Sequence, residues 1–178
     1  TGRNCTERKA ELYRRIREIK GIEATTSSKG QMPLEGVFVE LVSTLAKEGT
    51  IIAAILPNTH FTTKGNASVA IRKMLLEDFG LQMIFNYPQE NLFNDVIQNT
   101  SIVIGIKGTR TDNVRYLYCN ETVTEVDTRS ISYVLAMPFS EEGLANINND
   151  FEGCLLSRQY LNGTVDDGWQ IGNMSKQE

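Results

Sequence analysis

The residues best placed to do chemistry follow an apolar run in the first third of the chain. Ile51–Leu56 is typical of a buried strand, and Pro57 and Asn58 come directly after it. Open α/β sheets bind ligands at the carboxyl ends of their strands. Pro57 ends the strand, and the carboxamide of Asn58 offers hydrogen-bond donors and an acceptor. These two residues either shape a binding pocket or form an ordinary turn.

The polar loop over residues 58–66 is a second candidate site. Lys64 and the backbone amides around Asn66 are able to contact phosphate groups, although a loop with one lysine is more commonly just solvated. His60 lies in the same loop, with no carboxylate or hydroxyl partner in view. We therefore expect His60 to be a surface side chain.

Other arrangements that carry chemistry are excluded by spacing. Cys5, Cys119 and Cys154 are far apart, and His60 is the single histidine, so we expect no metal site. An odd number of separated cysteines fits a reducing cytoplasm better than a disulfide framework. The run 107–109 has the letters of a phosphate loop, but it lacks the upstream glycine and the following helix.

The elements that must position these residues alternate between helix and strand. The pattern predicts helices over Thr6–Lys20, from Pro33 to Gly49 and over Ala67–Phe79, and strands over Leu81–Asn86 and Ser101–Ile106. The buried stripe of the second helix is expected to be Val37, Phe38, Leu41, Val42 and Leu45. Shorter strands (Val114–Cys119, Thr122–Val126) and a weak helix over Ser140–Asn148 follow. This order predicts an α/β fold with a partial Rossmann-like sheet.

The strand Ile51–Leu56 predicts that the sheet is incomplete. A continuous apolar run is typical of a strand buried on both faces of a parallel sheet. The chain supplies too few strands and helices to surround such a strand. It also opens on Thr-Gly-Arg-Asn without an initiator Met, so we expect it to be a piece of a longer protein.

Length and charge limit the classes of function. The chain has 178 residues, 40% of them hydrophobic, and no apolar run approaches the roughly 20 residues of a membrane span. Its net charge of −4 argues against a self-sufficient nucleic-acid binder. Residues 1–30, however, carry eight Lys and Arg against four Asp and Glu. A contact with nucleic acid confined to one face is therefore allowed, beside the simpler interpretation of a solvated helix.

Five blocks in order resemble the N6-adenine DNA methyltransferases of restriction–modification systems, either type I modification subunits or type IIG enzymes. The blocks are Glu35–Val42, Leu45–Asn58, Ala70–Gly80, Ile84–Phe93 and Asn99–Ile104. The second is similar to the family's helix that leads into a strand ending in Leu-Pro-Asn. Residues 154–171 also have a weaker similarity to the segment that leads into a target-recognition region in type IIG enzymes.

The resemblance implies roles for individual residues. The parent enzyme would transfer a methyl group from S-adenosylmethionine to adenine N6 in double-stranded DNA, with the base extruded from the stack. Phe93 would cover one face of the adenine, unless it merely anchors a loop in the core. Pro57 and Asn58 would shape the base pocket, and Lys64 and Asn66 would contact DNA.

The resemblance also implies a division of the chain. Residues 1–31 would be a basic insertion, 32–109 the C-terminal half of the catalytic domain, and 110–178 an extension towards the target-recognition region. The catalytic and cofactor motifs of the family are not found in this sequence, so we expect the chain alone to be inactive. A specificity or restriction subunit is a further expected partner.

Two alternatives remain open at this stage. One is a methyltransferase with the same motif order that acts on rRNA or protein. Such enzymes usually lack an insertion like residues 1–31, and the strand at 99–104 fits them less well. The other is a non-catalytic α/β interaction module.

Overall fold

The computed structural model describes residues 2–27, 31–87, 99–120, 128–139, 145–148 and 150–169. Within these ranges the elements are, in chain order, α1 (Gly2–Lys20), α2 (Leu34–Leu45), β1 (Ile51–Pro57), α3 (Thr59–Thr62), α4 (Asn66–Glu77), β2 (Leu81–Tyr87), β3 (Thr100–Ile106), β4 (Asn113–Cys119), α5 (Thr128–Ala136), β5 (Ala145–Asn146), β6 (Phe151–Ser157) and α6 (Arg158–Gly163).

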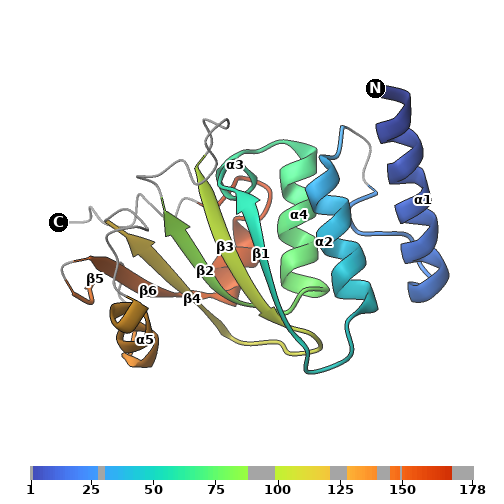
Figure 1. The fold of residues 1–178 in the computed structure, drawn as a ribbon. Coiled ribbons are helices and arrows are strands. Elements are labelled where there is room, and N and C mark those ends of the chain that lie inside the picture. Colours follow the sequence, from blue (N-terminus) through green and yellow to red (C-terminus); the bar gives the residue numbers. More distant parts are fainter. Residues whose placement is uncertain are drawn as a thin grey trace.

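The strands form one sheet in the order β1-β3-β2-β4-β6-β5 (Figure 1). Strands β2 and β4 are parallel, and the other neighbouring pairs are antiparallel. Strand β3 follows both β1 and β2 in the sequence but lies between them. The predicted α/β class is confirmed, with a sheet that is mostly antiparallel.

The alternation of side chains along the strands gives each face of the sheet its own core. One face packs against α2, α4 and α6, and its buried residues include Ile52, Ile84 and Val103 from the strands. The opposite face carries Phe85 and Leu117, which pack with residues of α5. Helix α1 lies outside α2, away from the sheet (Figure 1). The β1 end of the sheet is thus covered by helices on one face.

Strand β1 is an edge strand. It pairs with β3 along one side, and no strand within the described ranges pairs with its other side. Ile52 and Leu56 are buried, whereas Ile51 and Ile55 are 70% and 50% exposed. The prediction of a strand buried on both faces of a parallel sheet is therefore wrong for this structure. An apolar run identifies a strand but does not specify its neighbours.

Helix α2 is shorter than predicted and buries a narrower stripe. Pro33 occupies the N-cap position, and the helix ends at Leu45 rather than Gly49. Val37 is fully buried, but Phe38 and Leu45 are more than half exposed. Phe38 also lines an apolar groove between α2 and β1. The helix therefore presents apolar side chains to solvent beside the free edge of the sheet.

Three further predictions have separate outcomes. The loop expected over residues 58–66 contains the short helix α3. The helix expected over Ser140–Asn148 is wrong at Ala145–Asn146, which form β5. The strand expected over Thr122–Val126 lies outside the described residues.

The buried carboxylate of Glu40 ties α1 and the loop after it to the rest of the fold. Glu40 on α2 accepts hydrogen bonds from the backbone nitrogens of Thr25 and Thr26 at 2.6 and 2.8 Å, and from the Thr26 hydroxyl at 2.6 Å. Lys20 Nζ, at the end of α1, lies 3.1 Å from Glu40 and 2.9 Å from Asp78. Burial lowers the pKa of Lys20, but the hydrogen bonds to Asp78 and Glu40 outweigh it, so the pKa is raised.

In the described part of the chain, no helix has the length and apolar character needed to cross a lipid bilayer.

Candidate functional site

The end of strand β1 is held against strand β3. Pro57 is the register partner of Thr100, the first residue of β3. The backbone N–H of Asn58 donates to the carbonyl of Asn99 at 2.8 Å. Because β1 is an edge strand, Pro57 ends it without removing a ladder hydrogen bond from the sheet interior. The sequence-predicted pair therefore has a fixed position at the carboxyl end of β1.

A row of polar side chains continues from Asn58 across the sheet. Ser101 Oγ lies 3.2 Å from Asn58 Oδ1 and 3.4 Å from the carboxamide of Asn86 on β2. The other end of the Asn86 carboxamide lies 3.0 Å from the Tyr116 hydroxyl on β4. Ser101, Asn86 and Tyr116 are all buried, and Asn58 is half-buried. Burying such a row of polar groups lowers the stability of the fold unless the groups form hydrogen bonds with one another.

Burial keeps the Tyr116 hydroxyl protonated. Desolvation raises the pKa of Tyr116 strongly. The phenol therefore remains a neutral hydroxyl, able to donate a proton to a hydrogen bond throughout the physiological pH range.

Phe93, predicted to stack on a base, lies outside the described residues. The two ends of its segment are nevertheless fixed by the sheet. Tyr87, the last residue of β2, is the register partner of Thr100, and Thr100 also pairs with Pro57. The described chain therefore leaves the sheet at Tyr87 and re-enters it at Thr100, at the end of the sheet where Pro57 and Asn58 lie.

His60 is buried, so the prediction of a surface side chain is wrong. Its Nε2 lies 3.2 Å from Oε1 of Glu35, at the start of α2. This hydrogen bond, chiefly, holds the pKa of Glu35 below its ordinary value. The partner is 25 residues away in sequence, so no local pattern could have revealed it. The contact joins α3, directly after Asn58, to α2.

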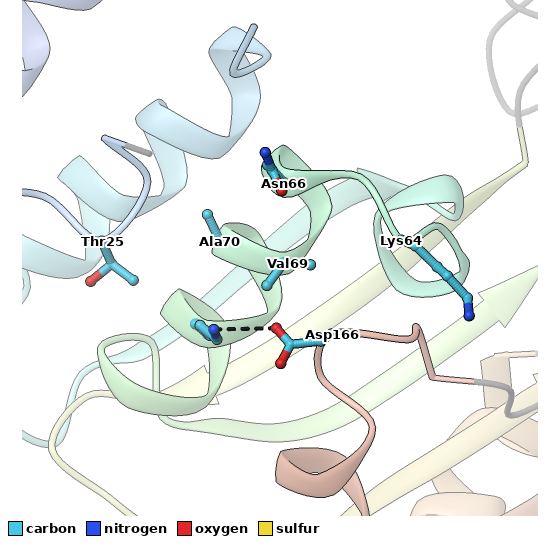
Figure 2. A pocket seen from close by; sticks show the side chains of 7 residues that line it. Thr25, Lys64, Asn66, Val69, Ala70 and Asp166 are labelled. Atoms are coloured by element: carbon cyan, nitrogen blue, oxygen red, sulfur yellow. Dashed lines mark ion pairs between the residues drawn. The ribbon is translucent and has the colours of Figure 1, made fainter. Parts of the chain in front are cut away.

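A pocket beside the beginning of α4 contains the predicted DNA-contacting residues. It has a volume of about 540 Å³ and is lined by Thr25, Lys64, Asn66, Val69, Ala70, Lys73 and Asp166. Lys64 and Asn66 are exposed, and Figure 2 shows them at neighbouring points of the chain, where it leads into α4. The structure therefore brings Lys64 and Asn66 into one pocket and adds Lys73, which the sequence interpretation missed.

Two aspartates on the turn after α6 face these lysines. Lys73 Nζ lies 3.3 Å from Asp166, and Lys64 Nζ lies 2.9 Å from Asp167. Figure 2 shows Asp166 reaching towards α4 from this turn. All four side chains are between 46% and 75% exposed, so the pairs are screened by salt and stabilise the fold little. Another anion is able to replace the aspartates at small cost.

The turn after α6 is locked onto α3. The backbone N–H of Trp169 donates to the carbonyl of Phe61 at 2.6 Å, and the indole N–H donates to the carbonyl of Leu161 at 2.9 Å. Gly168 has φ +91°, and a Cβ there would meet the Thr62 carbonyl oxygen at 2.6 Å. Arg72 on α4 donates to the carbonyls of His60 and Val165 at 2.5 and 2.7 Å. The turn after α6 thus braces the helix that follows Asn58.

Within the described ranges, no group of three or more His, Cys, Asp and Glu side chains is arranged to hold a metal ion.

Solved structures similar to this one come from restriction–modification systems. The type IIG restriction endonuclease BpuSI matches with a TM-score of 0.78 and 32% identity, over 90% of this chain and 18% of that chain. The type I restriction enzyme EcoKI M protein matches with a TM-score of 0.58 and 17% identity, over 78% of this chain and 37% of that chain. A type I methyltransferase subunit from Streptococcus thermophilus matches with a TM-score of 0.50 and 19% identity, over 70% and 26% of the two chains. The sequence matches no protein-family model and no curated protein.

The fold and these likenesses define the class: this chain is similar to one segment of restriction–modification enzymes, namely a type IIG restriction endonuclease and, in fold, type I methyltransferase subunits. The family resemblance stated from the sequence is confirmed at this level. The chain spans about a fifth of the length of BpuSI and just over a third of that of the EcoKI M protein.

Proposed function

We propose that this chain is part of the catalytic domain of an adenine-specific DNA methyltransferase. The whole protein would transfer a methyl group to N6 of an adenine extruded from double-stranded DNA, and this segment would supply part of the base pocket. The observation that carries the proposal is the convergence at one end of the sheet of Pro57, Asn58 and both ends of the segment that bears Phe93. An extruded base needs a stacking surface and hydrogen-bonding groups on its edge, and these residue types supply both.

The pocket beside α4 would contact the DNA backbone. Lys64 and Lys73 carry the positive charge, and Asn66 is the first residue of a twelve-residue helix whose N-cap, Gly65, forms no side-chain cap. Backbone N–H groups at such a helix start favour phosphate. We propose that phosphates replace Asp166 and Asp167 as partners of the two lysines.

The exposed apolar side chains beside β1 suit a domain that continues beyond this segment. Phe38 and Leu45 on α2, and Ile51 and Ile55 on β1, are each at least half exposed. We call these four residues the apolar margin. The apolar margin lies along an edge of β1 that no strand within the described ranges pairs with. This position supports the proposal that another part of the same catalytic domain covers the margin. The division at 32–109 and 110–178 remains a proposal, and so does a specificity or restriction subunit as partner.

S-adenosylmethionine would supply the methyl group in the whole protein. The strand-to-helix turns within the described residues, after β1 and after β6, contain no glycine. They do not fit the glycine-rich turn with which this family is expected to bind the cofactor. We therefore assign this segment to the base and the DNA, and derive no step through the cofactor.

The test uses the full-length protein that carries this segment. It is incubated with labelled S-adenosylmethionine and unmethylated DNA of mixed sequence, and the modified nucleosides are separated by liquid chromatography. We expect N6-methyladenine. Phe93→Ala is expected to lower the rate about 5- to 150-fold, the loss of one stacked base. Tyr133→Ala removes an exposed ring on α5 and serves as the matched control. Methylation of RNA or protein, or an undiminished rate in Phe93→Ala, would contradict the proposal.

A further inference from the structure

The polar row that ends at Asn58 has one side chain on each of three adjacent strands. It runs from Tyr116 on β4 through Asn86 on β2 to Ser101 on β3, and then to Asn58 after β1. This is also the order of the strands in the sheet. The row therefore connects the sheet interior with the half-buried side chain at the strand end.

The direction of the hydrogen bonds in this row depends on the orientation of Asn86. Suppose that its nitrogen faced Tyr116. The Tyr116 proton would then have no acceptor among the described residues, and the single Ser101 proton would face two amide oxygens. A buried donor without an acceptor costs about 1–3 kcal/mol.

The opposite orientation is equally open to Asn86, because a carboxamide has the same shape when its oxygen and nitrogen are exchanged. It gives the Tyr116 proton and the Ser101 proton one acceptor each. The Tyr116 hydroxyl then donates to the Asn86 oxygen across 3.0 Å, and the Asn86 nitrogen donates to Ser101 Oγ across a longer 3.4 Å. The Ser101 hydroxyl is left to donate to Asn58 Oδ1 at 3.2 Å. All protons in the row then point towards Asn58.

This direction determines which end of Asn58 faces outward. Its oxygen is taken by Ser101, and the backbone N–H of Asn58 is taken by the Asn99 carbonyl. The side-chain nitrogen of Asn58 has no hydrogen-bond partner in the described part of the chain. Two N–H donors are therefore presented beside the ends of the segment that carries Phe93.

We propose that Ser101 is a positioning residue that holds the Asn58 amide nitrogen towards the bound base, where it donates to a ring nitrogen of the extruded adenine. This inference rests on the proposed function. A fixed donor pairs with an acceptor, and N1, N3 and N7 of adenine are acceptors, whereas its exocyclic amino group is a donor. Asn58 would therefore recognise the ring and leave the amino group free to receive the methyl group.

The experiment uses the full-length protein and first maps the methylated site on mixed-sequence DNA. Duplexes that contain this site are then made with adenine, 1-deaza-, 3-deaza- or 7-deazaadenine at the target position. Asn58→Asp keeps the shape and removes the donors, and Ser101→Ala removes the positioning hydroxyl. Ser101→Thr keeps that hydroxyl. Ser43→Ala removes another buried serine hydroxyl, one that donates to the Val39 carbonyl inside α2, and serves as the matched control.

We expect the wild type to lose roughly 2- to 10-fold in kcat/KM on one deaza substrate, the value of one hydrogen bond. Asn58→Asp and Ser101→Ala should each have a kcat/KM on adenine that is lower than that of the wild type by a similar factor. For these two variants, replacing adenine with that deaza substrate should cause no further loss. Ser101→Thr should recover the rate, and Ser43→Ala should behave as the wild type. The thermal midpoint of each variant is measured in parallel.

Two other results have distinct meanings. If the wild type methylates no DNA, the proposed function fails, and the inference fails with it. If the wild type methylates DNA but Ser101→Ala equals the wild type on every substrate, the positioning role is overturned. It is equally overturned if the rate of Ser101→Ala falls together with its thermal midpoint while the variant still loses as much kcat/KM on the deaza substrate as the wild type does.

Discussion

The ring of Trp169 stacks on the ring of Phe61, with centroids 5.9 Å apart and planes inclined by 25°. Both side chains are buried. Phe61 belongs to the short helix α3 directly after Asn58, and Trp169 lies near the end of the described chain. A contact between residues more than a hundred positions apart therefore holds the helix next to the candidate site.

We expect Trp169→Ala to lower the free energy of unfolding by about 3–5 kcal/mol, because it leaves a large cavity that the backbone around Gly168 cannot fill. Urea unfolding followed by circular dichroism measures the change. Tyr133→Ala, at an exposed ring, should stay within about 0.5 kcal/mol of the wild type. A loss as small as that of the control would show that the stack does not hold the turn.

Glu40→Gln is expected to destabilise the chain by about 3–5 kcal/mol. The substitution places an amide nitrogen among the donors from Lys20, Thr25 and Thr26 and leaves part of the buried network unpaired. Urea unfolding followed by circular dichroism measures this change as well. Glu18→Gln, on the exposed face of α1, is the matched control. Equal stability of the two variants would contradict the role of Glu40 as the link between α1 and the fold.

Cys5 and Cys154 should differ in their reactivity towards thiol reagents. Cys5 is exposed, whereas Cys154 is buried, and burial raises the pKa of its thiol from 9.0 to about 11. We expect a thiol reagent at pH 8 to modify Cys5 promptly, and Cys154 only after the chain unfolds, as measured by mass spectrometry of digested protein. Rapid modification of Cys154 in folded protein would contradict its burial.

The same pKa shift predicts a pH dependence of stability. In the unfolded chain the Cys154 thiol ionises near pH 9, whereas in the folded chain it stays protonated to about pH 11. Its contribution to stability is therefore complete below pH 9 and is lost as the pH rises from 9 to 11. Cys154→Ala should flatten the fall of unfolding free energy in this window.

Substitutions in the apolar margin should act in opposite directions in two contexts. In the isolated 178-residue chain, Ile55→Lys should raise solubility and reduce self-association, measured by light scattering, because Ile55 is half exposed. In the full-length protein the same change should lower the yield of folded protein. Ile22→Lys replaces another exposed isoleucine, in the loop after α1. An equal effect of both substitutions in the full-length protein would argue against a covered margin.

The lysines of the α4 pocket predict a salt dependence. Lys64→Gln and Lys73→Gln should each reduce the slope of log K against log salt concentration by about 0.9, because each removes one phosphate contact. Fluorescence anisotropy with the full-length protein and a labelled duplex gives the slope. Lys47→Gln changes an exposed lysine beyond the opposite end of β1 and should leave the slope unchanged.

The local sequence pattern was sufficient to predict the main helices and strands. It did not predict which strands pair with each other or which side chains are in contact. The apolar run over residues 51–56 and the helical pattern over Ala67–Phe79 predict β1 and α4 with bounds close to those observed. Strand order depends on contacts between distant segments, and no local feature indicates that β3 enters between β1 and β2. For the same reason the hydrogen-bond partners of His60 and Ser101 could not be predicted from the sequence. Pro57 and Asn58, by contrast, were identified by their position after a strand.

The placement of β3 has a consequence for how the chain is made. Strands β1 and β2 leave the ribosome first, yet neither pairs with the other, because each pairs with β3. At about 5–20 residues per second, the stretch from Tyr87 to Ile106 takes roughly one to four seconds to synthesise. During that interval β1 and β2 have been synthesised but cannot yet pair with β3, and unpaired strand edges are templates for aggregation. Slower codons within this stretch would prolong the wait, so translation speed there should govern the soluble yield of the protein.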